Sequence, residues 1–174
     1  MRTWIRKPKT LLLAVVALVT LVLIVIYDYG SYVDSQKDAL RRAKRTWQHA
    51  TQGSDSYRMV VHVTRPSEPD AEYQVTVEGG QVVDVAALSD GRYTSVSLDA
   101  LAQDDIGLCA TVDRMFDFAA SKMDDESPWD WEIAFDPDLG YIKSFKVSCM
   151  GGLTAPAMRN CQEGFTVASL ELLP

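Results

Sequence analysis

The sequence is poor in the residues that build catalytic and metal centres. Of its 174 residues, only two are histidines, His49 and His62, and three are cysteines, Cys109, Cys149 and Cys161. Neither histidine has a neighbour in the sequence that suggests a general base or a metal pair, and no G-x-S-x-G motif occurs. We therefore expect no catalytic residue, no cofactor and no metal ion, and we predict that the protein is not an enzyme.

Positive charge is also scarce. The 17 lysines and arginines are outnumbered by 24 aspartates and glutamates, which gives a net charge of −7. Four of the cations, Arg2, Arg6, Lys7 and Lys9, lie in the N-terminal tail, so the rest of the chain is more acidic than the whole. Phosphate backbones are bound by clustered Lys and Arg, and the acidic body therefore argues against a nucleic-acid partner.

One segment carries no charge at all. Leu11–Tyr27 contains no charged residue, glycine or proline. The segment 10–29 around it, at about 1.5 Å per residue, is about 30 Å long, the thickness of a bilayer core. It predicts a transmembrane anchor between a basic tail at 1–9 and a domain at 30–174. A cleaved signal peptide is the main alternative, but no A-x-A cleavage pattern follows the apolar run.

The orientation of this anchor depends on the charges at its two ends. The basic tail favours a cytoplasmic N-terminus. Its cations lie closer to the apolar run than those on the far side, and the cysteines suit an oxidising compartment. We therefore predict a single-pass protein of the cell membrane with a cytoplasmic N-terminus and an extracytoplasmic C-terminal domain. The competing cations on the far side are Lys37, Arg41, Arg42, Lys44 and Arg45.

Helix and strand patterns alternate in the remaining sequence. Gly30 interrupts the apolar helix, and an amphipathic helical pattern begins at Val33. The domain is therefore expected either to sit close to the bilayer or to ride on one long, bent helix. Its basic side is either a lipid-contacting face or, preferably, a solvated one. A further helix is expected after Thr111, an N-cap residue. Strands are expected at 57–64, 73–78, 82–87, 129–136, 141–147 and 165–172, and residues 93–98 are compatible with an extension of the sheet.

The order helix, three strands, helix, three strands predicts an α+β fold. Each half has one amphipathic helix and an antiparallel meander with one apolar face. The economical packing places both helices on one face of a single sheet. The other face should then be largely open to solvent.

Cysteines and a short acidic turn supply the remaining site candidates. In an oxidising compartment, a disulfide bond between Cys149 and Cys161 is the preferred interpretation, and two unrelated buried thiols are the alternative. Cys109 is then either a small buried apolar residue or, less favoured, a reactive thiol near a helix N-terminus. Residues 136–140 have the pattern D-x-D-x-G, a fragment of a calcium loop, but a hairpin turn explains them better.

Several short motifs together suggest a family. Besides Trp47 ahead of Tyr57, they are V-T-V-E-G-G-Q-V (75–82), T-V-D-R-M-F (111–116), F-D-P-D-L-G-Y (135–141) and F-T-V-A-S-L (165–170). With these motifs, the chain from about Trp47 to its C-terminus resembles the bacterial domain of unknown function 6174, whose members are mostly secreted or lipid-anchored. The resemblance implies an extracytoplasmic domain with a layout like propeptide-type and β-lactamase-inhibitor-like folds, and it carries over no catalytic residue. This chain differs by its transmembrane anchor, by its long Cys-bounded loop and by lacking a cysteine cluster after the first strand.

Two functions from different classes remain after these exclusions. The leading hypothesis is a non-enzymatic extracytoplasmic module that binds a protein partner through the open face of its sheet. The alternative is a small-ligand or metal-sensing domain at the membrane surface.

Overall fold

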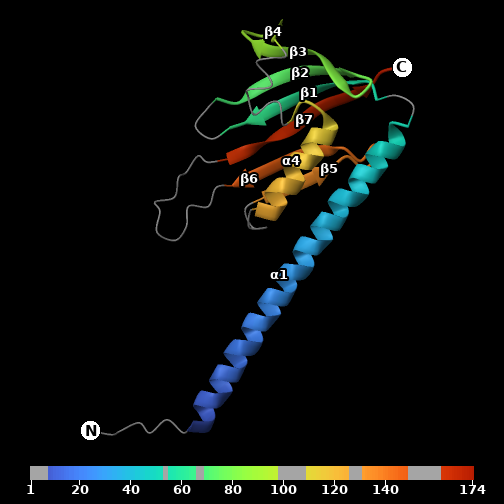
Figure 1. Cartoon of the computed structure of the whole chain (residues 1–174). Helices are drawn as coiled ribbons and strands as arrows, with labels where there is room; N and C mark the ends of the chain where they lie inside the picture. The colour runs from blue at the N-terminus through green and yellow to red at the C-terminus, as the bar shows by residue number, and fades with distance from the viewer. Residues whose placement is uncertain (1–7, 53–54, 66–68, 98–108, 126–130, 149–161) are drawn as a thin grey trace. The chain divides into compact units, whose positions relative to one another are not determined.

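The structure, a computed structural model, describes residues 8–52, 55–65, 69–97, 109–125, 131–148 and 162–174. The chain divides into two compact units, Met1–Asp38 and Ala39–Pro174. Nearly all regular structure after the first helix is antiparallel sheet, with one further described helix (Figure 1). The predicted α+β class with an antiparallel sheet is therefore confirmed.

The first helix, α1, runs from Pro8 to Ala50. Of the two alternatives left open by the sequence, the structure has the single long helix, which continues through Gly30. A single glycine costs a helix only about 1 kcal/mol relative to alanine, and helix-forming residues flank it on both sides. A Cβ placed on Gly30 would meet no atom within 4 Å, so no close packing contact requires the glycine.

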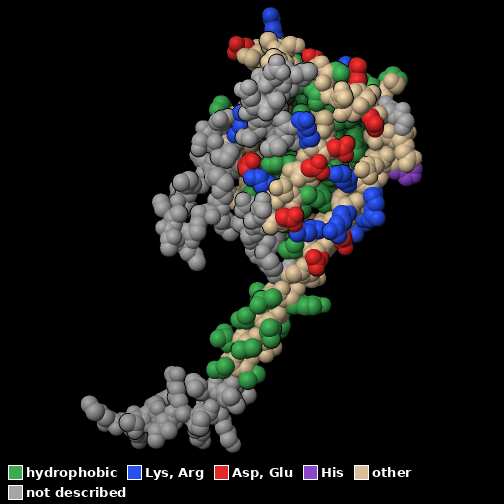
Figure 2. All heavy atoms as spheres, in the orientation of Figure 1, with side chains coloured by type: hydrophobic (Ala, Val, Ile, Leu, Met, Phe, Trp, Pro, Cys, Tyr) green, Lys and Arg blue, Asp and Glu red, His purple; other side chains and the backbone are tan. Residues whose placement is uncertain are grey.

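The N-terminal unit carries the apolar part of α1. Its described side chains from Ala14 to Ile26 are exposed, and Figure 2 shows hydrophobic side chains along the visible side of this stretch. The described helix is long and apolar enough to cross a membrane, and a signal sequence near the N-terminus would meet the same test.

Seven antiparallel strands form the sheet of the second unit, in the order β4-β3-β2-β1-β7-β6-β5. In the middle of the sheet, β1 pairs with the C-terminal strand β7. This pairing joins the strands of the two halves of the chain into one sheet. The strands are β1 (Tyr57–Thr64), β2 (Ala71–Glu78), β3 (Gln81–Ser89), β4 (Arg92–Ser95), β5 (Trp131–Phe135), β6 (Ile142–Ser148) and β7 (Gln162–Leu172).

Sequence analysis predicted three strands in the first half, and the structure has four. The fourth, β4, follows a two-residue turn at Asp90-Gly91, where both residues have positive φ, 52° and 74°. Such turns match the twist of a hairpin, and Asp-Gly is one of their strongest signals. The Gly79-Gly80 hairpin, which was predicted, has the same signature, with φ of 57° and 76°.

The core lies on one face of the sheet. Along β1, Tyr57, Met59, Val61 and Val63 are at most 4% exposed, and their neighbours in the sequence face the other way. The second helix, α4 (Val112–Asp125), packs on this inner face. Its Phe118 ring meets the rings of Phe145 and Phe165 at centroid distances of 5.8 and 6.3 Å.

The last turns of α1 complete the same core. Trp47 is 3% exposed, and its ring packs edge-on against Tyr57 and Tyr141, 5.3 and 6.3 Å away. Beside it, Lys44 Nζ lies 2.9 Å from the Asp117 carboxylate of α4. The segment from Ala39 to Ala50 is therefore part of the folded unit.

The start of α4 is fixed by side chains from two directions. The Thr111 hydroxyl oxygen accepts a hydrogen bond from the Arg114 amide at 3.2 Å, so the predicted N-cap is confirmed. The Tyr57 hydroxyl oxygen accepts one from the Val112 amide at 2.9 Å. Tyr57 thus ties β1 to both α1 and α4.

Candidate functional site

The face of the sheet opposite the core is polar, and we call it the outer face. No described helix packs on it, because the contacts of α4 and of the end of α1 are with the inner face. Its residues are mostly exposed or half-buried. On the central strands β1, β2 and β7, the residues of the outer face include Arg58, Val60, His62 and Thr64 of β1, Glu72, Gln74, Thr76 and Glu78 of β2, and Thr166, Ser169 and Glu171 of β7.

A line of paired residues, the transverse row, crosses this outer face. His62 stands opposite Glu72 on one side and Thr166 on the other. Its Nδ1 lies 3.2 Å from Glu72 Oε2, and the Tyr93 hydroxyl donates a hydrogen bond to the other oxygen of Glu72. This bond to a carboxylate raises the pKa of Tyr93. The row consists of Tyr93 and its partner Leu88, then Glu72, His62, Thr166, Ser144 and Ala134.

Exposed apolar side chains lie at one end of the transverse row. Leu88 is 40% exposed and Tyr93 is 41% exposed, and the two are directly paired across β3 and β4. Aromatic side chains are enriched at the centres of protein interfaces, where they contribute much of the binding energy. This end of the row therefore has the chemistry of a contact surface.

The outer face is large enough for a protein. With strands about 4.8 Å apart and about 3.3 Å per residue, seven strands of about eight residues cover roughly 29 by 26 Å, or about 750 Å². A specific interface covers about 800 Å² of each partner. Acidic residues outnumber basic ones on this face: Glu72, Glu78, Asp84, Glu132 and Glu171 stand against Arg58 and Lys146.

A hollow of a different kind lies on the inner side, between the end of α1 and the start of α4. We call it the α1–α4 pocket; its volume is about 240 Å³. Its floor is formed by buried side chains and its mouth by two exposed aspartates. The lining includes Trp47, Thr51, Tyr57 and Thr111, with Asp55 and Asp113 at the rim.

Burial, together with smaller contributions from the negative charges of Asp113 and Asp55, raises the pKa of Tyr57 at this pocket to about 12. The hydrogen bond from Val112 acts in the opposite direction and is the smaller effect. The folded state therefore holds Tyr57 in its neutral form well above the pH at which an unfolded chain loses the proton.

This shift predicts a loss of stability at alkaline pH. The unfolded pKa is 10.0 and the folded one about 12, so the stabilisation is complete below pH 10 and is lost as the pH rises through 12. The loss amounts to about 2–3 kcal/mol at 1.36 kcal/mol per pH unit. Denaturant unfolding of the wild type and of Tyr57→Phe at a series of pH values measures it. The difference in free energy of unfolding between the wild type and Tyr57→Phe should shrink above pH 10. A difference that stays constant with pH would contradict this account.

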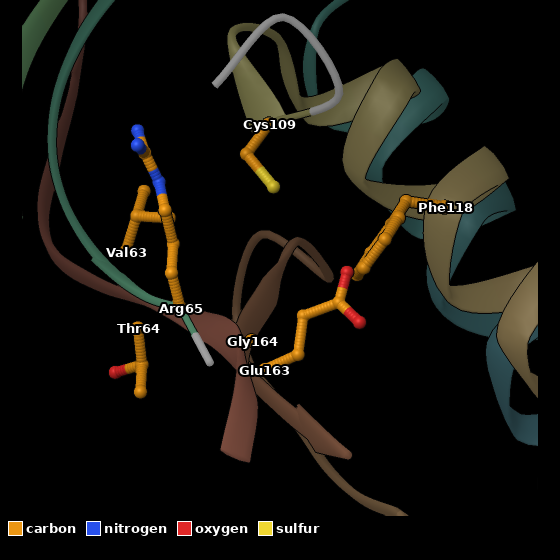
Figure 3. Close-up of a pocket in the computed structure, with 7 residues that line it drawn as sticks. All are labelled: Val63, Thr64, Arg65, Cys109, Phe118, Glu163 and Gly164. Carbon is orange, nitrogen blue, oxygen red and sulfur yellow. The ribbon is translucent and has the colours of Figure 1, made fainter. Parts of the chain in front are cut away.

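Cys109 lines a second, much smaller hollow (Figure 3). Its thiol points into a space bordered by Arg65, Phe118 and Glu163, with a volume of about 10 Å³. That is room for about one water molecule. Cys109 is 4% exposed, in agreement with the preferred prediction of a small buried residue. Glu163 is paired with Lys122, whose Nζ lies 2.9 Å away.

The Asp136–Gly140 turn is a hairpin turn. One Asp136 carboxylate oxygen accepts hydrogen bonds from the amides of Asp138 and Leu139, at 3.1 and 2.9 Å. The carboxylate is thus used to hold the turn, as the preferred interpretation of D-x-D-x-G predicted. Within the described residues, no group of three His, Cys, Asp or Glu side chains could hold a metal ion.

The other candidates from the sequence lie apart from one another or beyond the structure's description. His49 is exposed in the last turn of α1, and His62 lies on the outer face. The predicted disulfide between Cys149 and Cys161 falls outside the described residues, so it stays a prediction. Sequence analysis did not find that His62 pairs with Glu72, nor that Tyr93 donates a hydrogen bond to the same carboxylate. Both contacts depend on the register of the strands.

Comparison with known proteins gives one match. The model of the family of unknown function DUF6174 matches residues 39–151. No curated protein and no solved structure matched the chain. The match begins at Ala39, the first residue of the folded unit, and ends before the 165–170 motif that also suggested the family. Because it covers more than half of the sequence, the chain belongs to DUF6174, a family of unknown function.

Proposed function

We propose that this protein is a membrane-anchored, extracytoplasmic interaction module that binds a protein partner on the outer face of its sheet. The observation that carries the proposal is the one-sided packing of the sheet. Among the described residues, the end of α1 and α4 cover the inner face, while the transverse row is exposed or half-buried. A non-enzymatic role is favoured by the composition, with only two histidines in the chain.

The chemistry of the outer face indicates what kind of partner it would bind. Tyr93 and Leu88 supply an amphipathic contact point at the β4 edge, and the excess of carboxylates extends across the sheet. The complementary surface should therefore carry Lys and Arg around an apolar or aromatic site. Electrostatic attraction of this kind weakens with salt, so binding should fall as ionic strength rises.

Anchoring rests on the apolar stretch of α1. Leu11–Tyr27 is uncharged and the basic tail precedes it, a pattern that favours a retained anchor with the folded unit outside. Alkaline extraction of membranes, protease treatment of intact cells and the mass of the mature chain test this together. The proposal requires a full-length, membrane-retained chain whose C-terminal unit is degraded from outside. A shortened soluble chain would indicate a cleaved signal sequence instead.

The partner-binding proposal is tested by Tyr93→Ala in the full chain, with Ser121→Ala as the control. Both side chains are exposed, one on the outer face and one on α4. Tyr93→Ala should lower recovery of the specific partner from native membranes by about tenfold, as expected for an interface anchor worth about 1.4 kcal/mol or more. Ser121→Ala should leave recovery unchanged, and both variants should keep the wild-type melting temperature. Equal recovery with both variants would remove the transverse row from the proposal.

A further inference from the structure

The α1–α4 pocket has the size of a site for a small organic molecule. Its volume is about 240 Å³, whereas about 10–15 Å³ on the same measure is enough for one water. The pocket therefore has room for a compact ligand. It lies on the inner side of the unit, away from the outer face, so occupation of one site does not block the other.

The charges that line the pocket are negative. Asp55 and Asp113 line it, and no described lining residue is Lys or Arg. Both carboxylates act on the Tyr57 hydroxyl at the floor, where they help to raise its pKa. The C-terminal end of α1 adds the partial negative charge of its last carbonyl groups. A ligand in this pocket therefore gains most if it is a cation.

The start of α4 would normally favour an anion, but two of its first-turn amides already have side-chain partners. The Val112 amide donates to Tyr57 and the Arg114 amide to Thr111. Asp113 places a carboxylate in the first turn, where it offsets the positive end of the helix. The helix N-terminus therefore favours an anion less than an uncapped one would.

A bare metal ion suits the pocket less well than an amine. Calcium takes six to eight oxygen ligands, and the pocket offers two carboxylates and a few hydroxyl groups. An ammonium group needs only two or three hydrogen-bond acceptors around it, and charge-assisted bonds to carboxylates are the strong kind. The two lining carboxylates supply acceptors for one or two ammonium groups.

We propose that the α1–α4 pocket is a binding site for a small organic cation that carries one or two ammonium groups. Asp55 and Asp113 accept hydrogen bonds from the ammonium nitrogens. The hydroxyl groups of Tyr57 and Thr111 face the rest of the ligand, and Trp47 supplies an apolar wall. This site is independent of the protein-binding face, and either proposal can fail without the other.

Calorimetric titration of the detergent-solubilised full chain with putrescine tests the proposal. Three further probes identify the chemistry: butanediol has the same length without charge, succinate has the opposite charge, and magnesium chloride supplies a hard cation. Putrescine should bind and butanediol and succinate should not. No heat with putrescine, or equally strong binding of magnesium that displaces it, would overturn the proposal.

Charge-neutral variants locate the site. Asp55→Asn and Asp113→Asn should each weaken putrescine binding by about tenfold, the loss of one charge-assisted contact. Asp90→Asn is the matched control, because it removes the same charge from an exposed turn residue with φ of 52°, a conformation that asparagine tolerates. Equal weakening by Asp90→Asn would mean general attraction to an acidic protein and would refute a built site. Tyr93→Ala should leave putrescine binding unchanged.

Discussion

A chain that begins at residue 51 is expected to lose its cooperative fold, whereas a chain that begins at residue 39 should keep it. The residues between these two starts supply Leu40, Ala43 and Trp47, all at most 8% exposed. Removal of a buried tryptophan alone costs about 3–5 kcal/mol, and a domain of this size is stable by only about 5–15 kcal/mol. Thermal unfolding followed by near-ultraviolet circular dichroism distinguishes a packed chain from a collapsed one.

Trp47→Ala in the 39–174 fragment is the control for this experiment. It removes the contacts with Tyr57 and Tyr141 and leaves the helix in place. We expect it to keep a cooperative unfolding transition, at a clearly lower temperature than the parent fragment. If the shorter fragment melts like the longer one, the end of α1 is not part of the folded unit.

Gly140→Ala is expected to destabilise the protein by about 3 kcal/mol or more, because strain and overpacking act together. Gly140 has φ of 78°, which an L-residue adopts only at a cost. A Cβ at this position would also lie 2.7 Å from the Ala43 carbonyl oxygen and 2.7 Å from the Thr46 Cβ. The turn between β5 and β6 touches α1 here, so the helix would have to move away.

Gly91→Ala separates the cost of backbone strain from the cost of overpacking. Gly91 has φ of 74°, but a Cβ there would meet no atom within 4 Å. It should therefore show only the conformational cost of about 1–2 kcal/mol. Urea unfolding measures the loss of unfolding free energy in each variant. The excess loss in Gly140→Ala over Gly91→Ala is the cost of the contact with α1. Equal losses would show that the turn does not pack closely against the helix.

Much of the fold could be predicted from local patterns. The alternation in 57–64 and the helical spacing after Thr111 each match a described element, because one buried face imposes a period on the sequence. The fourth strand was predicted only as a segment compatible with an extension of the sheet, 93–98, because the Asp90-Gly91 turn signal was not used. Gly30 left two alternatives open, since a glycine weakens a helix without necessarily ending it.

The candidate sites were harder to predict, because they depend on contacts between distant segments. His62 and Glu72 meet only when β1 and β2 pair in one particular register, and Tyr93 joins them from β4. A signal was present, since His62 and Glu72 both occupy polar positions of adjacent strands. The α1–α4 pocket brings Trp47 and Asp113 together from separate helices, and the spacing of these residues in the sequence does not predict that they are close.

Site-specific photocrosslinking in intact cells tests the central claim most directly. The full chain would carry a benzophenone amino acid at Ser95 or Arg58 on the outer face, or at Ser121 on α4, all exposed positions. The account predicts one discrete protein adduct from both outer-face positions, none from Ser121, and loss of the adduct when Leu88→Asp is added. Adducts from Ser121 alone, or no adduct from either outer-face position, would contradict it.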